Sequence, residues 1–293
     1  MQYAHLTQII ALFILLLIVL TIVSARYIIQ RILWKGPQID SDTTPPHVDM
    51  PDSLAYTHID SLGTDRLCVY YPKRVDKTKR TAVFCHGVMC NCESNFNWYR
   101  SLETHFNVFA WDYRNYGRSE RRDNTVTDID VCVYDLQAVL RFVQRQLGIH
   151  KDEMRRRVFL IGRSLGAYVA MAHQTHATTL SYQRLDSLVL LFPLVNLVAS
   201  LSALTGVPNA LVYPVAGSVY MDDAVRSIAE RHRSRLLIIA SSDDTVVSYA
   251  HLRELVESLE TPQKNVQLHD VGGLHTNNAP IIFDLIAQFF AKT

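Results

Sequence analysis

The chain has 293 residues, of which 48% are hydrophobic, and its formal net charge is +1. This length suits a single α/β domain of about 250 residues or two smaller ones, and the apolar content is enough for a sizeable core. The near-neutral charge argues against a nucleic-acid-binding protein, because such proteins carry a strong basic field.

The first predicted element is an apolar segment at residues 6–25, LTQIIALFILLLIVLTIVSA, which contains no charged residue. A helix of about 20 such residues can cross the bilayer core. We therefore expect an uncleaved transmembrane anchor within residues 1–35. One alternative is a cleaved signal peptide ending near Ala25, which would lack a basic n-region and have an unusually long apolar run. The other alternative is a buried core helix.

The charges around this segment predict its orientation. Arg26, Arg31 and Lys35 follow the segment, whereas only His5 precedes it, so the positive-inside rule places the C-terminal side in the cytosol. We expect a single-pass membrane protein with a cytosolic catalytic domain, and a lumenal domain is the alternative. Residues 36–53 are rich in Pro, Asp, Ser and Thr, which predicts a linker before a domain at residues 54–293.

Strand-like and helix-like segments alternate through that domain. LCVYY is predicted as an antiparallel lead-in strand, and mostly parallel buried strands are predicted at RTAVFC, FNVFAW, RVFLI, DSLVLLF, RLLIIA and NVQLHD. Helices are predicted at 127–147, with Thr127 as the N-cap, at 249–259 and at 280–291. This order implies a mostly parallel sheet flanked by helices, with functional residues at the carboxyl ends of the strands. Residues 194–223 break the rhythm and are expected to form a small lid or an irregular connection.

A candidate nucleophile stands where one predicted strand meets a predicted helix. The stretch VFLIGRSLGAYVA places Ser164 between Gly162 and Gly166, and small residues at these two positions permit the tight turn that exposes a nucleophile. A Gly-X-Ser-X-Gly match is common by chance, so its position after a strand is what makes it informative.

Serine needs a base and an acid that orients the base, and in α/β-hydrolases the acid and the base follow the serine in that order. The acid candidate is Asp244 in SSDDTVVS, just after a predicted strand, with Asp243 as the alternative. The base candidate is His275, on the Gly-containing loop DVGGLHTNN before the last predicted helix. His269 is the competitor for that role, although it ends a predicted strand.

An oxyanion hole needs two backbone N–H donors. We expect one from Leu165, which follows the nucleophile, and the other from Val88, in the loop after VFCHG. His86 and Gly87 are expected to shape the turn that aims this loop, without a chemical role for the histidine.

With these elements in place, the chain resembles the membrane-anchored α/β-hydrolase-domain proteins of the serine hydrolase superfamily. The resemblance runs from about Tyr56 to the end and is carried by VFCHG, FNVFAWDYRNYGRSE, VFLIGRSLGAYVA, SSDDTVV and GGLHTNN. It implies an α/β-hydrolase fold and hydrolysis of acyl esters or thioesters of lipid-like substrates, as in protein depalmitoylases and monoacylglycerol lipases. It also implies Ser164 as nucleophile, Asp244 as acid, His275 as base, and a structural role for Asp112.

We therefore expect a serine hydrolase that works through an acyl-enzyme and needs neither a metal nor an organic cofactor. Its expected partners are a lipid-like acyl ester or thioester and the membrane. Two alternatives remain, namely a serine peptidase of the aminopeptidase type and a non-catalytic binding protein of the same fold.

Several other polar residues carry weaker expectations. Cys90 and Cys92 form a C-x-C pair without further ligands at metal-binding spacing, so no metal site is expected. Arg163 is expected to pair with a nearby carboxylate. A cluster of cations is expected either to be solvated or to bind an anionic headgroup; it comprises Arg114, Arg118, Arg121 and Arg122.

Overall fold

The computed structural model describes residues 36–39, 49–61, 65–121, 128–176, 184–194, 202, 221–231, 234–259, 265–275 and 279–291, together with most positions between 12 and 24. Residues 195–201 and 203–220, which hold most of the expected lid, lie outside this description, and so do residues 1–11 and 25–35 of the expected anchor. Within the described part of the chain, no helix combines the length and the hydropathy that a bilayer span requires.

Eight strands form one sheet in the order β1-β2-β4-β3-β5-β6-β7-β8. The hairpin β1–β2 is antiparallel, β2 is also antiparallel to β4, and every other neighbouring pair is parallel. The strands are β1 (Leu54–Ser61), β2 (Asp65–Pro72), β3 (Thr81–Cys85), β4 (Asn107–Trp111), β5 (Val158–Arg163), β6 (Ser187–Leu191), β7 (Arg235–Ala240) and β8 (Val266–Asp270). The predicted mostly parallel sheet with an antiparallel lead-in is confirmed.

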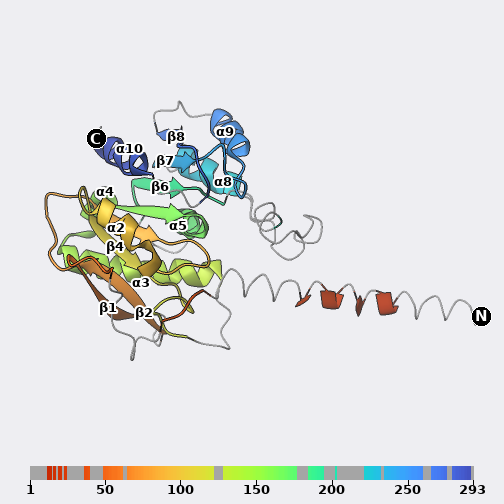
Figure 1. The fold of residues 1–293 in the computed structure, drawn as a ribbon, viewed down its shortest axis with the longest axis horizontal. Coiled ribbons are helices and arrows are strands. Elements are labelled where there is room, and N and C mark those ends of the chain that lie inside the picture. The colour runs from red at the N-terminus through yellow and green to blue at the C-terminus, as the bar shows by residue number, and fades with distance from the viewer. Residues whose placement is uncertain are drawn as a thin grey trace, which may run out of the picture.

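The helices connect these strands and cover both faces of the sheet (Figure 1). Their bounds are α2 (Phe96–Leu102), α3 (Ile129–Leu147), α4 (Lys151–Arg157), α5 (Leu165–His176), α8 (Met221–Arg226), α9 (Tyr249–Glu257) and α10 (Pro280–Ala291). A short 3₁₀ turn, η1 (Glu93–Asn95), precedes α2, and a π-helical turn, η2 (Ser227–Arg231), follows α8.

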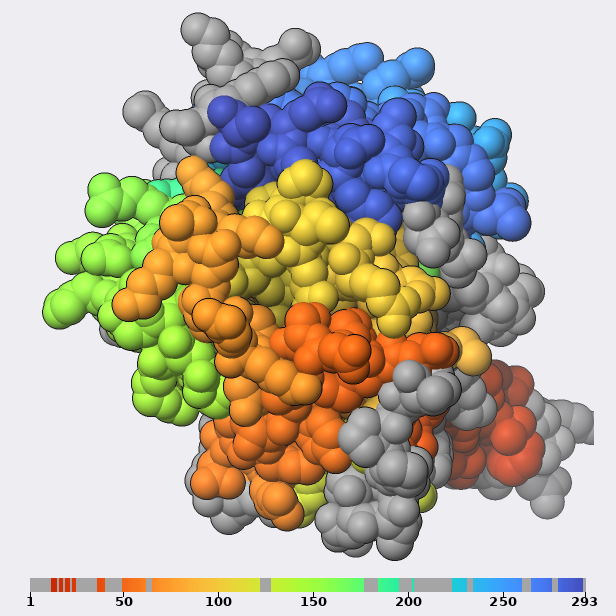
Figure 2. Space-filling view, turned by 60° about the vertical axis from the view of Figure 1, so that its left-hand side comes forward, coloured from red at the N-terminus to blue at the C-terminus, as the bar shows by residue number. Residues whose placement is uncertain are grey.

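The two faces of the sheet carry separate hydrophobic cores, because alternate residues of each strand point to opposite sides. Leu67 and Val69 of β2 join the core beneath α3, α5, α8 and α9, whereas Cys68 and Tyr70 join the core beneath α2 and α10. Helices α2 and α10 lie side by side, since the rings of Trp98 and Phe283 are 5.3 Å apart (Figure 2, gold and dark blue).

The structure corrects one predicted helix start. The N-cap of α3 is Asp128, not Thr127, because the Asp128 side chain accepts a hydrogen bond from Val131 N. The helix ends as predicted at Gly148, whose φ of 62° is the left-handed conformation that favours glycine at this position.

The start of the predicted linker is attached to the domain. Gly117 N donates to Pro37 O and Ile39 N donates to Gly117 O, both at 2.8 Å. A Cβ on Gly36 would lie 1.8 Å from Cδ1 of Tyr116, so only glycine allows the backbone to approach that ring so closely. Residues 36–39 therefore lie against the loop that follows β4.

Candidate active site

Ser164 occupies the turn between β5 and α5. Its φ of 52° is a left-handed value, and its N–H donates to Leu191 O at the end of β6 at 2.9 Å. The hydrogen bond to the neighbouring strand holds the turn against the sheet. Positive φ is rare for a residue with a side chain, and such conformations cluster at functional sites.

The two glycines around Ser164 are required by close backbone packing. A Cβ on Gly162 would lie 2.5 Å from Cα of Ala167, and one on Gly166 would lie 2.0 Å from Cys85 O. Both neighbours are backbone atoms that cannot rotate away. The turn therefore forms only with glycine at both positions, which is the steric condition expected from the sequence.

The structure brings His275 into contact with both other members of the expected triad. His275 Nε2 lies 2.9 Å from Ser164 Oγ, and His275 Nδ1 lies 2.7 Å from Asp244 Oδ2. These distances correspond to hydrogen bonds. His269 instead lies within β8, in register with Ile239 of β7.

Asp244 is held as an ionised hydrogen-bond acceptor. Burial raises the pKa of Asp244, but hydrogen bonds from His275 and from Val246 N and Val247 N outweigh burial, so the pKa lies below its ordinary value. The two backbone donors reach Oδ1 at 2.7 and 3.0 Å, which leaves Oδ2 for the imidazole. A carboxylate in this position fixes the orientation of the His275 ring.

Sequence reasoning missed three groups that support the His275 loop. Asp243, the alternative acid, accepts a hydrogen bond from Gly273 N at 2.9 Å, and Ser241 Oγ donates to Gly273 O at 2.5 Å. Phe192, at a φ of 47°, is buried and places its ring 5.9 Å from the imidazole. Asp243 and Ser241 belong to the quoted acid loop, whereas nothing in the sequence around Phe192 signals its contact.

The loop after β3 lies directly against Ser164, as an oxyanion loop should. A Cβ on Gly87 would be 3.4 Å from Cβ of Ser164, and Val88 is the next residue. Leu165 is the first residue of α5, so its N–H lacks an intrahelical acceptor. The two expected oxyanion donors therefore belong to backbone segments on either side of the serine.

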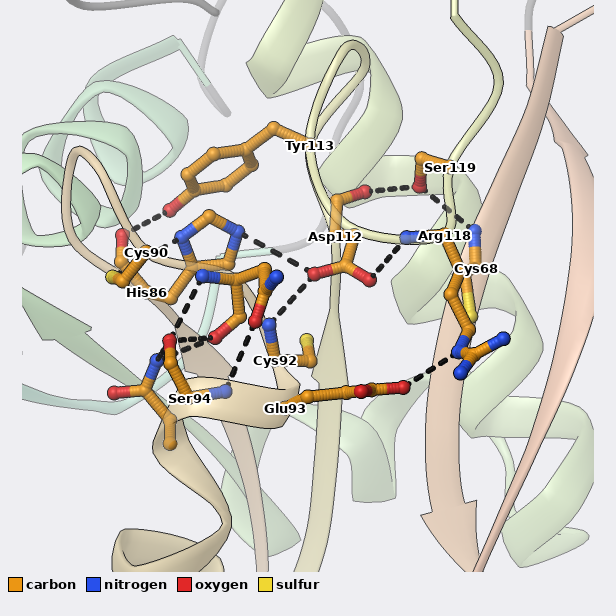
Figure 3. A network of polar contacts seen from close by, with 12 residues as sticks. Cys68, His86, Cys90, Cys92, Glu93, Ser94, Asp112, Tyr113, Arg118 and Ser119 are labelled. Carbon is orange, nitrogen blue, oxygen red and sulfur yellow. Dashed lines mark hydrogen bonds and ion pairs between the residues drawn. The ribbon is translucent and has the colours of Figure 1, made fainter. Parts of the chain in front are cut away.

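His86 holds the start of this loop through contacts with Gly87 and Tyr113 (Figure 3). Its Nδ1 lies 2.8 Å from Gly87 O, and its backbone carbonyl accepts a hydrogen bond from Tyr113 Oη at 2.7 Å. The centroids of the His86 and Tyr113 rings are 4.1 Å apart, with the rings tilted by 36°. Burial lowers the pKa of His86 to about 4, so the ring is neutral at pH 7. The residue shapes the turn, in agreement with the expectation.

Asp112 fixes the far end of the same loop (Figure 3). Its Oδ1 accepts a hydrogen bond from Cys92 N at 2.7 Å and its Oδ2 accepts one from Arg118 N at 3.0 Å. A Cβ on Gly117 would lie 2.1 Å from Oδ2, so the glycine makes room for the carboxylate. Burial raises the pKa of Asp112, while these backbone donors oppose the increase.

Two expectations about arginines are wrong. Arg163 donates to Asn95 Oδ1 at 2.9 Å and lies 5.4 Å over the Trp98 ring, and no carboxylate of the described residues lies within ion-pair distance. Arg114 and Arg118 are neither solvated nor available to an anion, because both are buried in ion pairs with domain carboxylates. These contacts join Arg114 to Asp65 and Asp135, and Arg118 to Glu93.

The remaining cation positions and the cysteine pair are described only in part. Arg121 is exposed and Arg122 lies outside the described residues. Cys92 is buried and Cys90 is partly buried, and the described part of the chain contains no group of three His, Cys, Asp or Glu side chains arranged to hold a metal.

Solved structures with the same architecture include several hydrolases. The esterase Pf2001 from Pyrococcus furiosus superposes with a TM-score of 0.64 at 18% identity, covering 89% of this chain and 98% of that one. A predicted CIB-like hydrolase from Thermoplasma acidophilum gives 0.55 at 17% identity, covering 82% and 99%. An α/β-hydrolase from Vibrio vulnificus gives 0.60 at 16% identity, covering 82% and 80%. At such identities the likeness establishes the α/β-hydrolase fold alone.

Comparison of the sequence with curated proteins found no match. A family model described as "Serine aminopeptidase, S33" matches residues 76–225, just over half of the chain. The match includes the loop after β3, Asp112 and the turn that carries Ser164. The chain therefore belongs to this family of α/β-fold hydrolases.

Proposed function

We propose that the protein is a serine hydrolase that cleaves acyl esters or thioesters of lipid-like or lipidated substrates. The observation that carries this proposal is the continuous hydrogen-bonded chain from Asp244 through His275 to Ser164, with contacts of 2.7 and 2.9 Å. Such a chain is the arrangement that converts a weakly nucleophilic hydroxyl into an attacking group.

In this mechanism His275 Nε2 removes the Ser164 hydroxyl proton as Oγ attacks the acyl carbonyl carbon. The N–H groups of Val88 and Leu165 stabilise the negative charge on the carbonyl oxygen, and Asp244 stabilises the imidazolium. His275 then donates the proton to the departing alcohol or thiol, which leaves an acyl-enzyme. Water activated by the same histidine attacks the acyl carbon and releases the acid. None of these steps calls for a metal ion or an organic cofactor.

Membrane association supports the choice of a lipid-like substrate. We propose that residues 1–35 anchor the protein and that the flanking Arg26, Arg31 and Lys35 keep the hydrolase domain on the cytosolic side. An enzyme held at a bilayer meets acyl chains embedded in it at high local concentration.

Peptide hydrolysis is a second candidate, because the family carries the description of a serine aminopeptidase. An aminopeptidase must also bind the ammonium group of its substrate. We favour the ester or thioester because the proposed anchor places the enzyme at a source of acyl chains. A non-catalytic protein would have no use for the assembled triad.

The first test is labelling by a fluorophosphonate, which reacts with an activated serine. We expect Ser164→Ala to abolish labelling and the hydrolysis of short-chain esters, because alanine lacks the hydroxyl that His275 would activate. Ser101→Ala, which changes a serine on α2, is the matched control and should label as the wild type does. Equal circular dichroism spectra would show that all three proteins are folded.

Undiminished labelling of Ser164→Ala would overturn the assignment of the nucleophile. A folded wild type that never labels would favour the binding protein. A substrate panel of aryl esters, palmitoyl thioesters and aminoacyl amides then separates the two enzymatic candidates, and turnover restricted to the amides would defeat our choice.

A further inference from the structure

Two exposed apolar side chains lie beside the candidate active site, and a third lies six residues after His275 in the chain. Met89 is 72% exposed and lies in the loop that carries Val88, Leu274 is 66% exposed and precedes His275, and Ile281 is 52% exposed in the first turn of α10. We call these three residues the mouth patch. Among the described residues from 36 onward, Tyr134 of α3 is the other large hydrophobic side chain with comparable exposure, at 38%.

The catalytic geometry fixes the positions of Leu274 and Met89. Leu274 is bonded to the residue whose imidazole lies 2.9 Å from Ser164 Oγ, and Met89 is two residues from Gly87, which packs against Ser164. Met89 also adopts a φ of 58°, a left-handed conformation that is unfavourable for a residue with a side chain. Exposure of these side chains does not stabilise the fold, because moving a large apolar group out of water lowers the free energy.

A second exposed apolar surface of this chain indicates what covers the patch. The described positions between residues 12 and 24 are helical, and the large apolar side chains there are 47–71% exposed. Such a helix needs an apolar environment, and a bilayer supplies one.

The described chain that follows the apolar helix in sequence lies close to the loop that carries Met89. Residues 36–39 follow the apolar helix and are hydrogen-bonded to Gly117, beside Tyr116. The Tyr116 ring lies 5.3 Å from the ring of His86, where the loop that carries Met89 begins. In Figure 1 the red N-terminal segment also lies on the side of the domain toward which the arrow of β6 points.

We propose that the mouth patch inserts into the boundary between headgroups and acyl chains of the membrane that holds the N-terminal helix. The substrate would then pass from the bilayer to Ser164 without crossing water. The benefit for catalysis depends on the proposed lipid-like substrate, whereas the insertion itself does not depend on catalysis. Apolar side chains at a membrane surface act in this way by burying apolar area a few ångströms below the headgroups.

The location of the patch is tested by quenching with brominated lipids. Ile281→Trp and Tyr134→Trp are made in the full-length protein and reconstituted in phosphatidylcholine vesicles with brominated acyl chains. Both variants share the three native tryptophans, so the difference between them reports the introduced ring. We expect stronger quenching for Ile281→Trp, also when Ser164 is replaced by alanine. Equal quenching of the two variants would overturn the proposal.

The consequence for catalysis is tested with one substrate dissolved in water and one embedded in a membrane. The double variant Leu274→Gln/Ile281→Gln should hydrolyse a water-soluble short-chain aryl ester within about twofold of the wild type. Its kcat/KM for a long-chain ester in phosphatidylcholine vesicles should fall about tenfold, because less apolar surface is buried in the interface. Tyr134→Gln, which removes an exposed apolar group on α3, should change neither rate.

The outcomes separate this proposal from the proposed function. Equal losses on both substrates would mean that the patch lines the acyl site and not the membrane contact, and would contradict insertion. A wild type that hydrolyses neither ester would reject the proposed function, and the quenching experiment would still decide whether the patch enters the membrane.

Discussion

Positive φ values gather around the candidate site. Met89, Ser164 and Phe192 have φ between 47° and 58°, and each contacts the site or lies beside a residue that does. Asn115, with a φ of 62°, stands on the loop after β4, and asparagine tolerates this conformation better than most residues. These residues adopt an intrinsically unfavourable backbone conformation where the loops converge on Ser164. The stability of the surrounding sheet compensates for this strain.

Asp112 provides the sharpest test at the scale of one residue. Both of its oxygens accept hydrogen bonds from backbone N–H groups, those of Cys92 and Arg118. Asp112→Asn replaces one acceptor with an NH₂ group that cannot accept, so one N–H loses its partner. We expect a loss of about 1–3 kcal/mol in the free energy of unfolding. Displacement of the loop after β3, which we propose carries the oxyanion donor Val88, should also slow fluorophosphonate labelling by about tenfold to a hundredfold.

Chemical denaturation and the labelling rate check this prediction. Asp76→Asn is the matched control, because Asp76 is an exposed aspartate outside the site whose Oδ1 also accepts a hydrogen bond from a backbone N–H. A slower labelling rate in the control, or an unchanged one in Asp112→Asn, would show that Asp112 does not position the loop.

The junction of β3, β5 and α5 gives a prediction at the scale of an element. Gly166→Ala would place a Cβ 2.0 Å from Cys85 O, so the first turn of α5 must move away from β3. We expect the free energy of unfolding to fall by about 3 kcal/mol or more, together with loss of labelling. A backbone oxygen cannot move away from the new methyl group by changing a side-chain rotamer. Thermal unfolding monitored by circular dichroism measures the first effect.

Gly148→Ala serves as the comparison. No atom lies within 4 Å of a Cβ at Gly148, so the only cost there is the left-handed backbone at the end of α3. That cost is about 1 kcal/mol. Similar losses for the two variants would mean that α5 can shift without penalty, contrary to the packing described above.

The elements differ in how far their sequences predict them. The central strands β3 and β4 are buried along their whole length, so each appears as a continuous apolar run. β1 is mostly half-buried at the edge of the sheet, and α4 buries Met154 alone among seven residues, so neither carries a clear pattern. These two elements depend on tertiary contacts that a local pattern does not contain.

The same division applies within the site. Ser164, Asp244 and His275 were predictable because their order and their positions at strand ends are properties of the chain. The partners of Arg114 and Arg163 were not, because Asp65 and Asn95 are distant in sequence and reach the arginines only in the fold. When the partner of a charged residue is far away in the sequence, the sequence alone predicts that the residue is exposed to solvent.

Two buried histidines predict how the stability of the whole molecule depends on pH. Burial lowers the pKa of His86 to about 4 and that of His173 to about 3, from an ordinary value of 6.5. Below about pH 6.5 the unfolded chain binds these protons and the folded chain does not, so stability falls as the pH falls. The raised pKa of Asp112 acts in the opposite direction.

A variant isolates the contribution of one histidine from these opposing effects. Between pH 7 and pH 5, His173→Gln should lose about 2 kcal/mol less unfolding free energy than the wild type loses. Urea unfolding at both pH values measures each loss relative to the same protein at pH 7. Identical losses would mean that burial does not lower the pKa of His173 in the folded protein.

The five cysteines have a consequence for the molecule as a whole. Cys90 is partly buried, and the other four, Cys68, Cys85, Cys92 and Cys132, are buried. Burial raises the pKa of every one of these thiols, so the reactive thiolate is scarce in the folded state. An alkylating reagent therefore reacts with the buried thiols chiefly when the sheet opens. These thiols are distributed over β2, β3, the loop after β3 and α3. The order in which the reagent modifies them therefore reports the order in which these parts of the domain unfold.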